Sequence, residues 1–129
     1  MIKHIVMWSV RGDDEAMRRR NVALLQREFE SMRGRVPGLL HLEIGVDFSR
    51  IDYACDVVLY SEFVSREALA AYSDHPEHLR VKRALGDMRI ARHQVDYEVA
   101  ATDRACSPEP AAQRAGHDTP GDDNHVQAL

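Results

Sequence analysis

The stretch AYSDHPEH, residues 71–78, places a tyrosine and two histidines close together. An imidazole gains or loses a proton near neutral pH, and a phenol can donate a hydrogen bond to an oxygen on which negative charge develops. Tyr72 and His78 are therefore candidates for acid–base chemistry. The spacing of His75 and His78 is one that metal ligands use, but Pro76 breaks the geometry and no third ligand is evident, so no metal is expected.

The same stretch also predicts a helix boundary. The residue before a proline avoids the helical conformation and proline fits the first helical position, so His75 should cap a helix over PEHLRVKRALGDM. This capping role explains His75 better than catalysis does. The apolar side of the helix, which turns His78 inward, comprises His78, Val81, Leu85 and Met88. Ser65 should cap the preceding helix, REALAAYS, which has Leu69 and Tyr72 on one side.

Periodicity places the remaining elements. Strands are expected at 3–10, 38–48, 55–63 and 89–99, and a first helix runs from Asp13 or Asp14 to about Arg33. Its apolar stripe is Val22, Leu25, Phe29 and Met32. The second strand should have His41 and Glu43 outward and, on the other face, Leu40, Leu42, Ile44 and Val46.

The resulting order, β-α-β-β-α-β, predicts an α+β, ferredoxin-like fold with a four-stranded antiparallel sheet. The first and last strands are antiparallel neighbours in this fold, which brings His4 near Asp96. Helices cover only one face of the sheet. The other face, which carries Ile5 and Met7, is apolar and would be bare in a monomer. We therefore expect a homodimer with the two sheets face to face.

Composition excludes several classes of protein. The net charge of −4 does not favour nucleic-acid binding, and the three arginines at 18–20 have acidic neighbours. No stretch is long and apolar enough to span a membrane, and the N-terminal segment does not read as a signal peptide. Two cysteines, Cys55 and Cys106, make no disulfide framework, so a cytoplasmic protein is expected. No dinucleotide-binding or P-loop motif is present, and no cofactor is expected.

The composition changes near residue 101. Residues 101–129 contain three of the five prolines and no aromatic residue. Such a segment buries too little apolar surface to offset its ordering entropy. We expect one folded domain over residues 1–100, followed by a disordered C-terminal tail over 101–129.

Four motifs in register resemble the Dabb family, the stress-responsive dimeric α/β-barrel domains. They are MIKHIVMWSV, VPGLLHLEIG, AYSDHPEH and VDYEV, and the resemblance covers residues 1–100. It implies a dimer whose sheets form a barrel, with a pocket between sheet and helices in each protomer. The implied ligand is a small hydrophobic or aromatic molecule. We expect the pocket to be lined by His4, Val6, Trp8, Leu25, Phe29, Val57 and Leu59.

The resemblance also implies candidate catalytic residues. A similar plant protein of the family closes a linear polyketide by an aldol condensation without a cofactor, using the tyrosine and second histidine of the Y-x-x-H-P-x-H motif. Those positions are Tyr72 and His78 here, and its last-strand aspartate corresponds to Asp96, which could orient His78 as a buried carboxylate. Val57 and Phe29 replace a histidine and a tyrosine of that cyclase pocket, so two polar groups that would handle a polyketide are missing.

Three functions remain open from the sequence. The first is a small-molecule binding domain, and the second is a cofactor-independent cyclase, isomerase or monooxygenase. The third is a structural dimerisation module, in which the cluster of polar side chains satisfies itself inside the core. A pocket of roughly 300 Å³ or more between sheet and helices would favour the first two.

Overall fold

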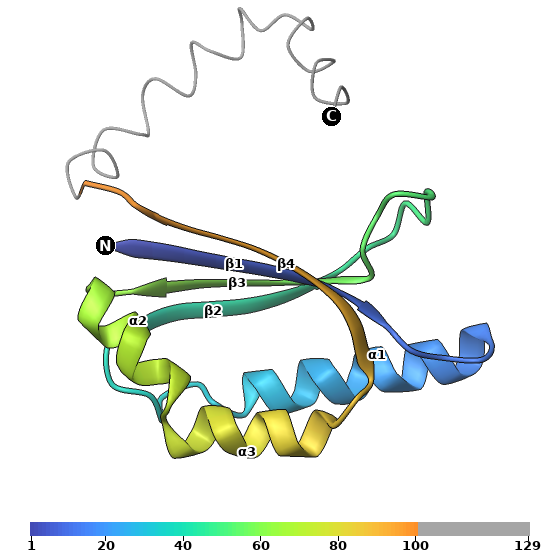
Figure 1. The fold of residues 1–129 in the computed structure, drawn as a ribbon, viewed down its shortest axis with the longest axis horizontal. Helices are drawn as coiled ribbons and strands as arrows, with labels where there is room; N and C mark the ends of the chain where they lie inside the picture. Colours follow the sequence, from blue (N-terminus) through green and yellow to red (C-terminus); the bar gives the residue numbers. More distant parts are fainter. Residues whose placement is uncertain (101–129) are drawn as a thin grey trace, which may run out of the picture. The chain divides into compact units, whose positions relative to one another are not determined.

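A computed structural model describes residues 1–100, and the tail expected at 101–129 lies outside the described residues. The elements are β1 (Ile2–Val10), α1 (Glu15–Glu30), β2 (Leu39–Val46), β3 (Val57–Phe63), α2 (Arg66–Ser73), α3 (Pro76–Leu85) and β4 (Arg89–Glu98). The strands form an antiparallel sheet in the order β2-β3-β1-β4. The helices of residues 1–100 lie on one side of it (Figure 1). This is the expected ferredoxin-like α+β fold.

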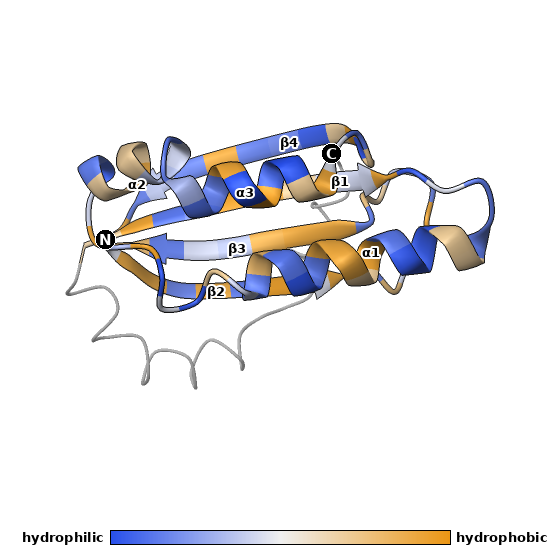
Figure 2. Ribbon diagram, turned by 90° about the horizontal axis from the view of Figure 1, so that it is seen from below, coloured by the Kyte–Doolittle hydropathy of each residue, from blue (hydrophilic) through white to orange (hydrophobic). Residues whose placement is uncertain are grey.

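The core lies between the sheet and the helices. In β1 the even-numbered side chains face the helices and are buried, whereas Met7 is 37% exposed on the opposite face. The predicted apolar stripe is buried, with Val22, Leu25 and Phe29 on α1 and Met32 in the turn that follows it, because the helix ends at Glu30 rather than near Arg33. Figure 2, seen from the helix side, shows α1 along β2 and β3 and α3 nearer β1 and β4. Helix α3 therefore positions His78 above the half of the sheet that carries His4.

The strand β2 departs from the predicted alternation at Leu40. The register between β2 and β3 shifts between Leu39 and His41, and this irregularity places Leu40 in solvent, 58% exposed. Leu39 packs against the core in its place. The prediction was wrong at Leu40 because it assumed an uninterrupted period of two.

The helix boundaries follow the predicted caps. The side chain of Asp14 accepts a hydrogen bond from the Met17 N–H, and that of Ser65 accepts one from the Ala68 N–H. His75 caps α3, since its Nδ1 accepts a hydrogen bond of 3.0 Å from the Glu77 N–H. The cap fixes the start of α3 and hence the place of His78, which lies three residues further on.

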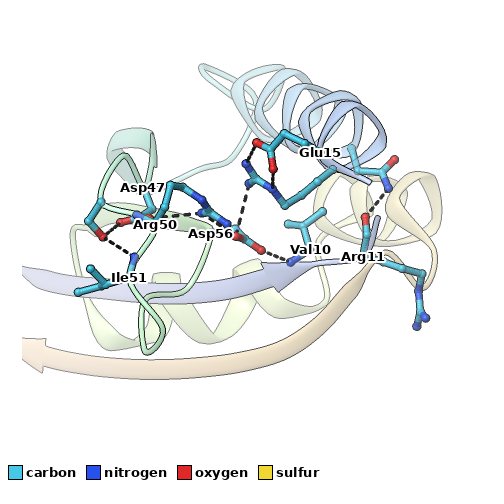
Figure 3. Close-up of polar contacts among 10 residues, drawn as sticks. Val10, Arg11, Glu15, Asp47, Arg50, Ile51 and Asp56 are labelled. Carbon is cyan, nitrogen blue, oxygen red and sulfur yellow. Dashed lines mark hydrogen bonds and ion pairs between the residues drawn. The ribbon is translucent and has the colours of Figure 1, made fainter. Parts of the chain in front are cut away.

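The connection between β2 and β3 is held by a polar cluster around Asp56 (Figure 3). Asp56 is 7% exposed and accepts a hydrogen bond of 2.7 Å from the Val10 N–H. Its other oxygen contacts the guanidinium groups of Arg18 and Arg50, at 3.4 and 3.1 Å. Arg50 also pairs with Asp47 at the start of the connection. These contacts fix the connection on the face of the sheet that the helices leave open (Figure 1).

Candidate functional site

A cavity of about 600 Å³ lies between the helix-covered face of the sheet and helices α2 and α3. Its apolar lining comes from β1, β3, α1 and α3, and comprises Val6, Trp8, Leu59, Phe29 and Leu79. The rings of Trp8 and Phe29 are stacked, with centroids 5.2 Å apart. A smaller space of about 280 Å³ shares part of this lining and extends toward β4, with the residues His4, Leu69, Tyr72, Ser73, His78, Arg92, Gln94 and Asp96.

Tyr72 lies between two imidazoles on the wall of the cavity. Its ring centroid is 4.4 Å from that of His78 and 6.1 Å from that of His4. The Tyr72 hydroxyl makes no hydrogen bond to any residue in the described range 1–100. Because no fully buried side-chain nitrogen or oxygen in that range lacks a partner, this hydroxyl must reach the cavity. Burial raises the pKa of Tyr72 well above its usual value, so the phenol stays protonated and can donate.

His78 presents one ring nitrogen that is free to accept a proton. Its Nδ1 lies 3.1 Å from the carbonyl oxygen of Ser73, and because a carbonyl can only accept, Nδ1 carries the proton. The neutral ring then has its lone pair on Nε2, for which no described residue is a partner. His78 is half-buried rather than fully buried, and it lines the cavity as the helix pattern predicted.

The environment of His78 favours the neutral imidazole. Burial lowers the pKa of His78 most, and the cationic side chains of Lys82 and Arg89 lower it further, which outweighs the opposite effect of the Ser73 carbonyl. The neutral ring is the form that can act as a base.

We therefore expect the nuclear magnetic resonance titration of the His78 ring to have a midpoint below 6.5, the ordinary value for histidine. The folded state resists protonation of His78, so its contribution to stability is complete above pH 6.5 and falls as the pH drops below that value. Lys82→Met should move the midpoint upward, because it removes a neighbouring positive charge. His78→Gln assigns the resonance, and a midpoint at or above 6.5 would contradict this account.

Asp96 contacts His4 and not His78. The two residues pair across β1 and β4 as predicted, and the His4 Nδ1 lies 2.6 Å from a carboxylate oxygen of Asp96. The other oxygen accepts a hydrogen bond from Gln94. The side chain of Asp96 is 35% exposed, so the expectation of a buried carboxylate that orients His78 is wrong. The reason is that Asp96 lies in register with His4, whereas the Nδ1 of His78 is already satisfied by its own helix boundary.

Most of the residues expected to line the pocket do so in the structure, and two do not. His4, Val6, Trp8, Phe29 and Leu59 line the cavity. Leu25 and Val57 are buried in the core but do not line the cavity. Within residues 1–100, no group of three or more histidine, cysteine, aspartate and glutamate side chains is placed to hold a metal ion.

Sequence reasoning missed the cations of the cavity. Lys82, Arg89 and Arg92 all line it. Arg92 pairs with Trp8 across β1 and β4, and every second residue of β4 shares a face with Asp96. The alternation of side chains along β4, which predicted the position of Asp96, therefore also could have predicted that Arg92 faces the cavity. Lys82 lies one helical turn after His78, so its place on the same side of α3 could also have been predicted.

The family profile described as the stress responsive A/B barrel domain, or Dabb, matches residues 2–99. The chain belongs to the Dabb family. The match spans all the elements of the fold, from β1 to β4. It confirms the family resemblance of the four sequence motifs. No curated protein matches the Dabb chain significantly.

Solved structures share the fold of this Dabb domain. A dimeric ferredoxin-like protein from Bacteroides fragilis is similar with 25% identity and a TM-score of 0.69, over 76% of this chain and 95% of that one. A Dabb-family protein from Mesorhizobium loti has 21% identity and a TM-score of 0.59, over 78% and 97%. A hydroxynitrile lyase from Passiflora edulis has 12% identity and a TM-score of 0.64, over 78% and 94%. No helix among residues 1–100 is long and apolar enough to cross a membrane.

Proposed function

We propose that this Dabb protein binds a small hydrophobic or aromatic molecule in the cavity between the sheet and helices α2 and α3. The observation that carries the proposal is the Tyr72 hydroxyl, a protonated donor that bonds no described residue and reaches a cavity of about 600 Å³ lined by both apolar and polar side chains. The alternative, a polar cluster that satisfies itself in the core, leaves this hydroxyl and the Nε2 of His78 without partners. Pockets of this size are typical of small-molecule sites.

The single tryptophan of the chain offers a direct test of binding, since Trp8 lines the cavity. Titration with 2-acetonaphthone, a neutral aromatic ketone, should shift the one indole N–H resonance in a saturable way. Val6→Phe places a ring in the cavity and should weaken binding by roughly tenfold or more. Met7→Phe adds the same ring to the opposite face and is the matched control. Shifts confined to the face of Met7 would contradict the proposal.

We also propose that the functional unit is a cytoplasmic homodimer formed through the open face of the sheet. Met7, Val95 and Tyr97 on this face are 37%, 57% and 43% exposed in the single chain. Phe48 and Tyr53, in the connection that projects on the same side, are 94% and 82% exposed. Ferredoxin-like neighbours of this chain are dimeric proteins, which supports a second copy as the partner that covers the patch.

A second candidate function is cofactor-independent proton transfer at a carbon next to a carbonyl group. The positions of His78 and Tyr72 favour it. The Nε2 of His78 would remove the proton, the electron pair of the C–H bond would form an enolate, and the Tyr72 hydroxyl would donate to the enolate oxygen. Return of the proton from His78 to the same carbon completes an exchange. In a cyclisation the enolate carbon would instead attack a second carbonyl, and the alkoxide formed from that carbonyl would take the proton from His78. The His4–Asp96 pair holds its imidazole close to Tyr72.

A further inference from the structure

Three cations line the cavity without a carboxylate partner. Lys82, Arg89 and Arg92 make no side-chain hydrogen bond or ion pair with any residue of the described part of the chain. The same lining contains one carboxylate, Asp74. Even when its histidines are neutral, the lining of the cavity therefore has a net positive charge. The chain as a whole carries a net charge of −4.

Several other arginines among residues 1–100 are paired with carboxylates. Arg18 contacts Glu15 and Asp56, and Arg80 contacts Glu28 and Glu77. Such pairing neutralises guanidinium groups that help to hold the fold. Arg89 and Arg92 differ from these paired arginines in that no carboxylate of residues 1–100 pairs with them, although they line a cavity.

Arg89 is a half-buried cation that a bound anion would stabilise. Its guanidinium carbon lies 5.6 Å from the centroid of the Trp8 ring, which holds the group against the floor of the cavity. Arg89 is half-buried, and burial together with the neighbouring charge of Arg92 lowers its pKa. A half-buried, unpaired cation beside a like charge opposes folding unless something compensates it. A bound oxyanion would do so.

We propose that the cavity recognises an amphipathic oxyanion, a molecule with an aromatic or aliphatic body and one carboxylate or phosphate group. The body would lie on Trp8 and Phe29, and the charged group would bind the guanidinium groups of Arg89 and Arg92, whose planar forks match both kinds of oxyanion. Tyr72 and His78 line the same cavity and would face the remainder of the molecule. The inference rests on the proposed binding function and specifies its ligand class.

The test compares three probes with the same ring system in low salt. These are 2-acetonaphthone, 2-naphthoate, in which a carboxylate oxygen replaces the methyl group, and 2-naphthyl phosphate. At least one oxyanion should bind roughly tenfold more tightly than the ketone, as expected for a charge-assisted contact. Arg89→Met and Arg92→Met should each remove most of the preference for the oxyanion over the ketone.

The controls separate the inference from the function on which it rests. Arg83→Met removes an exposed arginine of α3 that does not line the cavity, and it should leave all three affinities unchanged. The better of the two oxyanions identifies the group that the site accepts. Equal affinities for the three probes, or a preference that survives both arginine variants, would overturn the inference alone. Failure of all three probes to bind would contradict the proposed function as well.

Discussion

Replacing His78 with alanine should abolish the exchange of the methyl protons of 2-acetonaphthone for deuterium while the protein remains folded. The wild-type protein should accelerate this exchange, because the Nε2 of His78 is an unprotonated base on the wall of the cavity. A positioned general base contributes on the order of 10²–10⁴ in rate. Tyr72→Phe should slow the exchange by roughly 10²-fold, because the enolate oxygen loses its donor. The proton signal of the methyl group, followed in deuterium oxide, measures both rates.

The stability of the same variants distinguishes a site from a packed core. The Tyr72 hydroxyl bonds no residue within 1–100, so Tyr72→Phe should leave the free energy of unfolding nearly unchanged or raise it. His75→Asn is the matched control, since it alters the same motif outside the cavity lining and asparagine retains a capping oxygen. It should retain the wild-type exchange rate. Full exchange in His78→Ala, or strong destabilisation by both Tyr72→Phe and His78→Ala, would refute the catalytic roles.

Replacing Val95 with lysine should convert a dimer into a monomer at micromolar concentration. Val95 pairs with Ile5 on the open face of the sheet and is 57% exposed in the single chain, so the protomer itself should tolerate the change. In a two-fold dimer the substitution places two new charges in one apolar interface. Such a change should weaken association by roughly two orders of magnitude or more. Sedimentation velocity measures the shift.

Val64→Lys is the control for this result. Val64 is 55% exposed, close to the value for Val95, but it follows β3 outside the sheet. The control should remain dimeric. A wild-type protein that sediments as a monomer, or a Val95→Lys variant as dimeric as the control, would contradict the proposed interface.

Topology and burial could be predicted from the sequence because they depend on local patterns. The stripe that includes Leu25 and Phe29 defined the buried face of α1, and the His75-Pro76 pair defined the start of α3. The contact of His4 with Asp96 followed from strand neighbours alone. Each of these features needs only the period of an element or the order of the strands.

The remainder depends on contacts between elements, which periodicity does not encode. The irregular register at Leu40 is a property of the β2–β3 pairing. The contact of the His78 Nδ1 with the Ser73 carbonyl, which leaves Asp96 to His4, arises where α2 meets α3. The cations of the cavity come from α3 and β4, and only packing brings Lys82 close to Arg89 and Arg92. The sequence therefore predicted the histidines and the tyrosine of the candidate site, but not the lysine and the two arginines around them.

Structure determination of the protein crystallised with 2-naphthoate tests the central claim most directly. Our account predicts the naphthyl ring against Trp8 and Phe29, the carboxylate at Arg89 and Arg92, and the Tyr72 hydroxyl and the Nε2 of His78 facing the bound molecule. An empty cavity, with the probe bound only on the open face of the sheet around Met7, would contradict it.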